Sequence, residues 1–217
     1  MLDENDLNMF KPNRKIVYSY LGDNEEDDKY FERCYEIERE IFEKFEKYLY
    51  VKIFIDSSDE KFIKSYDEHI FHHNKNIMEK SGFGLLCPED INIPPYDEDG
   101  GDGNDEIPNN EYTARINFDI KIQCHIIRAN DTIWQPTVVM VHPIPMNTLP
   151  NIFRPIETIN PDYIGNLRVD INRHSNKEGV IINKYDIIYQ LINIGLDPIY
   201  VERVSTIEEL YTTKLRV

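Results

Sequence analysis

The sequence predicts a mainly β domain preceded by an α/β N-terminal extension. From Ser81 onward, short apolar runs alternate with Pro, Asn and Gly, which is typical of the short strands of a sandwich or barrel. Upstream of Ser81 the apolar residues recur every three or four positions, which is the spacing of amphipathic helices. The chain has 217 residues, of which 41% are hydrophobic and 12% aromatic, so it can bury a sizeable core.

The N-terminal region, residues 1–47, begins with a predicted short strand at Lys15–Leu21. The acidic segment after this strand suits the first turn of a helix. That helix is predicted to run from about Tyr30 to Tyr48, with an apolar stripe at Tyr30, Cys34, Ile37, Ile41, Phe45 and Tyr48. Two interpretations of the stripe stay open: it packs on its own domain, or it pairs with a partner or a second copy of the chain.

The next segment predicts a strand at Tyr48–Ile55 and then a second helix that ends at about Met78. Ser57 or Ser58 is the expected N-cap. The apolar stripe of this helix is Phe62, Tyr66, Ile70, His73 and Ile77. His69, His72 and His73 have the spacing of a zinc site, but no cysteine or carboxylate is placed to complete it, so we expect histidines without a metal.

The region after Ser81 predicts six strand segments, at 91–93, 114–127, 137–141, 166–171, 179–183 and 186–194. A polar, acidic and glycine-rich stretch from Pro94 to Thr113 predicts a mobile loop, with its acidic part at about 96–112. The EF-hand pattern for calcium fails there, because Asp102 stands where the turn needs glycine.

The formal net charge of −16 argues against nonspecific binding to nucleic acid or to anionic membranes. No apolar run approaches the roughly 20 residues of a membrane span, and no signal peptide is visible. Cys34, Cys87 and Cys124 are far apart, so we expect reduced thiols in a cytoplasmic compartment. The excess of Ile, Asn, Lys and Tyr suits an AT-rich genome such as that of a large DNA virus, which would place the protein in the host cytoplasm or the virion.

Four segments after Lys80 combine strand-forming runs with turn residues in a fixed order. They are Ser81–Pro95 (SGFGLLCPEDINIPP), 114–122 (ARINFDIKI), Thr158–Leu167 (TINPDYIGNL) and Asn183–Ile192 (NKYDIIYQLI). Together they resemble the trimeric dUTPase/dCTP deaminase superfamily. Its first motif has a G-[YF]-D-L strand and a P-E-D-x-x-I-P-P turn, its third reads I-D-x-x-Y-R-G, and its fourth reads K-G-D-R-I-x-Q-L. The resemblance covers about Lys80 to Val204.

The chemistry of that family depends on residues that this chain lacks. The family's third-motif aspartate is the general base, and Asn160 stands there, although an amide cannot accept a proton at a useful pH. The first-motif aspartate is Gly84. The second motif, P-R-S-S, aligns with Val141–Ile144, which holds neither serine nor arginine. The family's fifth motif is a glycine-rich arm, and the tail 205–217 contains no glycine.

Other family positions are kept or exchanged for apolar residues. The kept ones can all be explained by turn geometry and folding; they are Tyr163, Gly165, Asp186 and Gln190. The exchanged ones are arginines and a glycine of the third and fourth motifs, now Ile164, Tyr185 and Ile187. We expect these three to plug a groove near Tyr163.

A proton shuttle like that of the dCTP deaminase branch is one catalytic alternative, beside residual dUTP hydrolysis. Asp170 falls where that branch has a glutamate, and Asp162 lies two residues after Asn160. We expect neither to compensate, because a misplacement of about 1 Å can cost ~10²-fold in rate. Asp170 is expected to be a solvent-facing strand residue.

The sequence therefore predicts a dUTPase-like jelly-roll (β-clip) domain at residues 48–204. By resemblance it would be a homotrimer. The apolar stripe of the N-terminal helix is the surface expected to bind a protein partner if it does not pack on its own domain. We expect a catalytically inactive structural or protein-interaction module without metal or cofactor. The alternative is a divergent nucleotide-binding protein, dUTP pyrophosphatase or dCTP deaminase-like enzyme, in which Tyr163 and Gln190 would bind the nucleotide with Mg²⁺.

Overall fold

The computed structural model describes residues 39–79, 82–93, 113–128, 134–145, 152–173 and 179–212, and this part of the chain is mainly β. The first sheet has the order β13-β1-β5-β6, with strands at Ile199–Val204, Lys47–Ile55, Ile120–Arg128 and Gln135–Pro136. The second has the order β2-β12-β7-β9, with strands at Gly82–Leu86, Ile187–Ile192, Val139–Pro143 and Glu157–Ile159.

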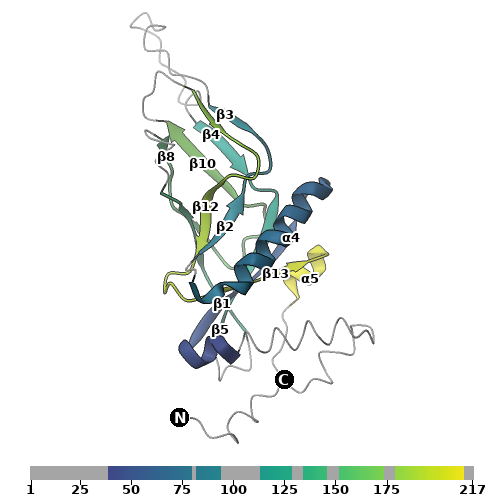
Figure 1. Cartoon of the computed structure of the whole chain (residues 1–217), viewed down its shortest axis with the longest axis vertical. Coiled ribbons are helices and arrows are strands. Elements are labelled where there is room, and N and C mark those ends of the chain that lie inside the picture. The colour runs from purple at the N-terminus through teal and green to yellow at the C-terminus, as the bar shows by residue number, and fades with distance from the viewer. Residues whose placement is uncertain are drawn as a thin grey trace, which may run out of the picture.

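Two smaller sheets complete the β structure. One has the order β4-β10-β8, with strands at Thr113–Asn117, Arg168–Arg173 and Ile152–Phe153; the other pairs β11 (Val180–Ile182) with β3 (Ile91–Ile93). In Figure 1, β1 and β5 lie toward one end of an elongated molecule, and β3, β4 and β8 lie toward the other. The predicted mainly β class is confirmed.

The helix α4, Glu60–Lys75, lies alongside β13 (Figure 1). Its predicted stripe is confirmed, because Phe62, Tyr66, Ile70 and His73 are all buried. The expected cap is wrong: Oδ1 of Asp59 accepts hydrogen bonds from the backbone N–H groups of Lys61 (2.9 Å) and Phe62 (3.2 Å). A carboxylate at this position also interacts favourably with the helix dipole, which a serine hydroxyl does not do.

The ends of both predicted helices differ from the structure. The helical segment 39–44 ends before Phe45, and Tyr48 already belongs to β1. Of the apolar stripe predicted for the first helix, Ile41 is the one residue that lies in a described helical segment and is buried, with 0% exposure. The second helix stops at Lys75, and a 3-10 turn at Ile77–Glu79 follows it. Tertiary pairing of β1 with two strands outweighs the helical spacing at Tyr48.

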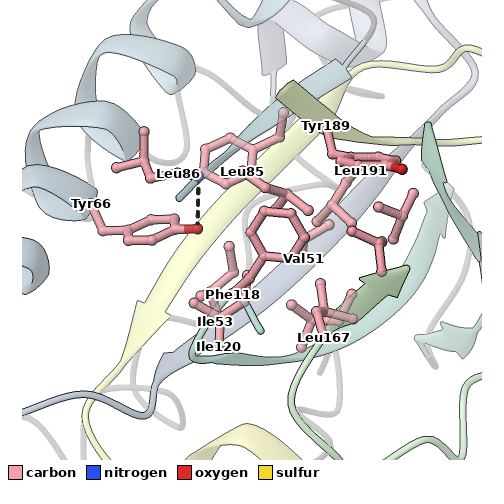
Figure 2. Close-up of a cluster of buried hydrophobic side chains, with 14 of the residues drawn as sticks. Val51, Ile53, Tyr66, Leu85, Leu86, Phe118, Ile120, Leu167, Tyr189 and Leu191 are labelled. Atoms are coloured by element: carbon pink, nitrogen blue, oxygen red, sulfur yellow. Dashed lines mark hydrogen bonds between the residues drawn. The ribbon is translucent and has the colours of Figure 1, made fainter. Parts of the chain in front are cut away.

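β1 is buried on both faces because a cluster of apolar side chains packs against each face. Leu49, Val51 and Ile53 face the main core, whereas Tyr48 and Tyr50 join a second cluster with Ile41, Ile77 and Ile127. Figure 2 shows the main core, where Tyr189 and Leu191 of β12 approach Phe118 and Leu167. There the hydroxyl of Tyr66 accepts a hydrogen bond from the backbone N–H of Leu86 (3.1 Å).

The predicted strand at 114–127 is two strands in the structure. Phe118 and Asp119 separate β4 from β5, and Asp119 has a φ of 51°. Aspartate tolerates this left-handed conformation better than most residues. The strand can therefore break at Asp119 although apolar and polar residues alternate on both sides of it.

α4 protects the outer edge of β13. The side-chain amide of Asn74 donates to the carbonyl of Val201 (2.7 Å), and its Oδ1 accepts from the Val201 N–H (3.1 Å). Nε2 of His73 bonds the carbonyl of Ile199 (2.8 Å). These side chains satisfy backbone groups that would otherwise be open to another strand.

α5, Ile207–Tyr211, closes the described chain over the outer face of the first sheet. A capping box joins Thr206 and Glu209 at its start. The ammonium group of Lys52, only 1% exposed, donates to the carbonyls of Glu209 (2.8 Å) and Thr212 (2.6 Å). The buried cation therefore holds the C-terminal end of α5, where the helix dipole favours positive charge.

Several predictions fall outside the described residues: the strand at Lys15–Leu21, Cys34, the acidic loop at 96–112 and the tail after Thr212. Cys87 and Cys124 are buried and free, as expected. Within the described ranges, no helix has both the length and the apolar character to cross a membrane.

Candidate functional site

The second sheet places three of the family-like segments side by side. Gly84 of β2 and His142 of β7 both lie opposite Gln190 of β12 in the strand register. The amide of Gln190 lies over Gly82, because a Cβ atom there would be 2.3 Å from its Oε1. Segments that are distant in the sequence thus meet in one row across the sheet.

The space beside Gly84 is occupied by Ile187. A Cβ atom on residue 84 would lie 2.6 Å from Cγ2 of Ile187 and 3.4 Å from Nε2 of His69. The carbonyl of Gly84 is bonded by the same His69 nitrogen at 3.0 Å. A carboxylate side chain at residue 84 does not fit unless Ile187 moves.

The loop that holds Asn160 is closed by its own backbone. The carbonyl of Asn160 accepts from the N–H of Tyr163 (3.1 Å), and the hydroxyl of Tyr163 donates to the carbonyl of Asn166 (2.7 Å). A Cβ atom on Gly165 would lie 2.7 Å from this hydroxyl. Tyr163 and Gly165 therefore form one turn, in which glycine leaves room for the phenol ring. The Tyr163 side chain remains 38% exposed.

The turn before β12 keeps the shape that a glycine would favour. Oδ2 of Asp186 accepts from the N–H of Asn183 (2.9 Å) and from its side-chain amide (3.1 Å). Tyr185 has a φ of 72°, a conformation that costs a non-glycine residue about 1–3 kcal/mol. Its ring stacks on Phe62 with a centroid distance of 6.2 Å, and the Lys184 ammonium lies 5.2 Å from the ring centroid.

The two candidate proton carriers, Asp170 and Asp162, differ in their surroundings. Asp170 makes a two-pronged ion pair with Arg115 on the neighbouring strand, at 2.7 and 3.0 Å. This pairing lowers the pKa of Asp170, whereas a carboxyl group that shuttles protons near neutral pH needs a raised pKa. Asp162 is exposed in the turn after Asn160.

Arg154 is a cation that the sequence interpretation missed. Its Nη1 donates to the carbonyls of Ile144 (2.6 Å) and Ile188 (3.3 Å), so it joins the end of β7 to β12. Burial lowers its pKa. An arginine does therefore reach the segment aligned with the second motif, but it binds backbone oxygens there. Its position ten residues downstream of Ile144 gave no motif by which to find it.

The residues expected to form one plug contact different parts of the structure. Ile187 lies over Gly84, and Tyr185 stacks on α4. Ile164 is 69% exposed, and its carbonyl accepts from the hydroxyl of Tyr211 in α5 (3.3 Å). In one chain Ile187 lies over Gly84 and Ile164 is exposed, so the plug of a groove near Tyr163 by these three residues stays a prediction.

The described residues contain no group of three or more His, Cys, Asp or Glu side chains arranged to hold a metal ion. His69 and His73 instead bond carbonyl oxygens of β2 and β13. Burial raises the pKa of the Cys87 thiol to about 12, with the charge of Asp186 as a second cause, so Cys87 is not a reactive nucleophile.

The chain matches no known family profile and no curated protein sequence. Among solved structures, the native EIAV dUTPase is similar at 22% identity, over 53% of this chain and 75% of that chain, with a TM-score of 0.37. The Staphylococcus bacteriophage 80alpha dUTPase is similar at 16% identity, over 62% and 86% of the two chains, with a TM-score of 0.36. The dUTPase from phage phi11 of S. aureus has 14% identity, the same coverage and a TM-score of 0.36. The chain is thus a mainly β protein with partial structural similarity to dUTPases.

Proposed function

We propose that this protein is a dUTPase-like chain without catalytic activity, which acts as a structural or protein-interaction module. The observation that carries the proposal is the contact between Gly84 and Ile187. A dUTPase-like site needs polar and charged side chains around a nucleotide, and here an aliphatic side chain fills the space next to a glycine.

The other family-like residues have contacts that support a structural role. Tyr163 and Gly165 close a turn, and Asp186 closes the turn that holds Tyr185. Arg154, the cation nearest to the second-motif segment, donates to two carbonyl groups. Polyphosphate requires several converging cations and N–H donors, and each of these groups already has a partner within the fold.

The proposal includes a homotrimer, which rests on the resemblance of the sequence motifs. A large DNA virus is the proposed source, and its particle or the host cytoplasm the proposed location. An interaction role agrees with the net charge of −16, because an acidic surface disfavours nucleic acid and favours basic protein partners.

Calorimetry with dUTP and a nonhydrolysable dUTP analogue, each with and without Mg²⁺, tests the inactive assignment. The expected result is no heat beyond dilution and no release of pyrophosphate. Micromolar binding would contradict a purely structural role and favour the nucleotide-binding alternative. In that case Asp162→Ala and Asp170→Ala show whether either carboxylate supports turnover, with the exposed Glu68→Ala as a matched control.

Light scattering coupled to size-exclusion chromatography tests the assembly separately. A mass of three chains is expected at micromolar protein concentration. A monomer over the whole accessible concentration range would refute the trimer without restoring catalysis, so the two parts of the proposal fail independently.

A further inference from the structure

The outer face of the first sheet carries a concentration of buried polar atoms without hydrogen-bond partners. They come from β1, β5 and the residue before β6: the Tyr50 hydroxyl, Gln123 Oε1, both ring nitrogens of His125 and Trp134 Nε1. His125 is 0% exposed and lies opposite Tyr50 in the register of β1 and β5. Leaving so many polar atoms buried and unpaired is costly, and it marks a closed arrangement that water would stabilise if it entered.

Trp134 is the cover of this cluster. Its ring centroid lies 4.6 Å from that of Tyr50 and 5.8 Å from that of His125. It immediately precedes β6, a strand of only two residues that pairs with β5 at His125 and Ile126. Two further hydrogen bonds hold β6 and its flanks. The N–H of Thr137 donates to the carbonyl of Cys124 (3.0 Å), and Nη1 of Arg128 donates to Oε1 of Gln135 (2.8 Å). A two-residue edge strand is among the least stable parts of a sheet.

In the part of the chain that the structure describes, no hydrogen-bond acceptor contacts either ring nitrogen of His125. Lys52 on β1 is a buried cation near it. Across β1, Glu202 of β13 lies opposite Lys52, and the Glu209 carboxylate of α5 accepts from the N–H of Ser205. Lys121 on β5 pairs with Asp56, and Arg128 at the end of β5 bonds Gln135. Tyr50 and Tyr200 are the titratable rings that stack beside the cluster, and no acceptor among the described residues bonds His125.

We propose that residues 134–136 form a strap that opens when His125 takes a proton, and that this makes the Tyr50–His125–Trp134 surface accessible below neutral pH. With the strap closed, the imidazole is buried beside the ammonium group of Lys52. With the strap open, water hydrates the imidazolium and the other unpaired polar atoms.

The burial of His125 and the nearby Lys52 charge support this inference, because they lower the pKa of His125 from 6.5 to about 4 in the closed arrangement. An imidazole with a lowered pKa in the closed state and an ordinary pKa in the open state favours opening as the pH falls from 6.5 toward 4. Between pH 8 and pH 5 the equilibrium constant for opening should rise about 30-fold.

Trp134 is the one tryptophan of the chain, so its fluorescence reports directly on the strap. Acrylamide quenching of Trp134 and hydrogen exchange at the Thr137 amide are measured at pH 8 and pH 5 on the full chain. Exchange is corrected for its intrinsic pH dependence. Thr137 should lose about 30-fold in protection, whereas the Val51 amide in the middle of the sheet keeps its protection. An equal loss of protection at the Thr137 and Val51 amides would mean global unfolding and would overturn the proposed strap opening.

His125→Leu should abolish the pH response, and His72→Gln, which removes an exposed histidine on α4, should retain it. An unchanged response in His125→Leu would overturn the proposal. If that variant fails to fold, histidine NMR of the natural chain decides: a His125 resonance that titrates near its ordinary pKa while Trp134 stays protected overturns the proposal, and a resonance shifted toward pH 4 supports it.

Discussion

Ile187 of β12 lies directly against Gly84 of β2, at a distance that leaves no room for a side chain on residue 84. Gly84→Asp should therefore destabilise the protein by about 1–3 kcal/mol, as overpacking of a filled site does. In an Ile187→Ala background the same substitution should cost less, with a coupling free energy of about 0.5–3 kcal/mol. Urea denaturation of the two single variants and the double variant measures it. Equal costs in both backgrounds would contradict the steric explanation.

At Tyr185 a glycine variant is expected to be more stable than an alanine variant, the reverse of the usual order. At a φ of 72° glycine is unstrained, whereas alanine keeps the strain and loses the ring contact with Phe62. Tyr185→Ala should be less stable than Tyr185→Gly by about 1 kcal/mol. Thermal and urea unfolding compare the two variants. The same two substitutions at Lys64, an exposed position inside α4, are the control at which the ordinary preference for alanine over glycine should hold. An alanine variant at Tyr185 that is the more stable one would refute the left-handed turn.

Asn74 makes two hydrogen bonds to the backbone of Val201 at the edge of β13. Asn74→Ala should cost about 1–3 kcal/mol, because it leaves the backbone groups of an edge strand without partners. Asn76→Ala removes a single exposed bond to the carbonyl of His72 and should cost less. Urea unfolding gives both values, and light scattering shows whether the opened edge promotes aggregation. Equal small effects for the two variants would mean that α4 does not protect the edge.

Cys87 and Cys124 should resist alkylation in the native protein. Burial raises the pKa of both thiols, for Cys87 to about 12, so the reactive thiolate is scarce at pH 8 and becomes more abundant only as the pH rises far above it. In a Cys34→Ser variant, mass spectrometry should find no iodoacetamide adduct at pH 8 and two adducts in denaturant. Rapid modification of the native variant would show that these thiols are accessible.

The sequence predicted elements with a clear period and missed features that depend on distant residues. The stripe from Phe62 to Ile77 and the strand at Tyr48–Ile55 follow from local spacing, and the structure contains both. The end of the first helix was wrong because Tyr48 pairs across the sheet with Ile127, a partner that no local window contains. The break at Asp119 was missed because aspartate gives no strong signal for positive φ.

In the candidate site, too, the sequence identified some residues and missed the contacts between distant ones. Motif comparison identified Gly84 and Ile187 as exchanged positions, but only the structure shows that one fills the space beside the other. The bond from Arg154 to Ile144 joins strands through a loop, and the cluster around His125 combines three elements. Such contacts depend on which strands become neighbours, and residue spacing along the chain does not encode that.

The position of β1 between β5 and β13 has a consequence for how the chain is made. β1 is the first described strand to leave the ribosome and β13 the last, yet they pair in parallel from Leu49 to Phe54. Until Ile199–Val204 emerges, one side of a very apolar strand has no neighbour. Such long-range closure slows folding and exposes intermediates to aggregation, so productive folding of this sheet is expected only after Val204 has emerged from the ribosome.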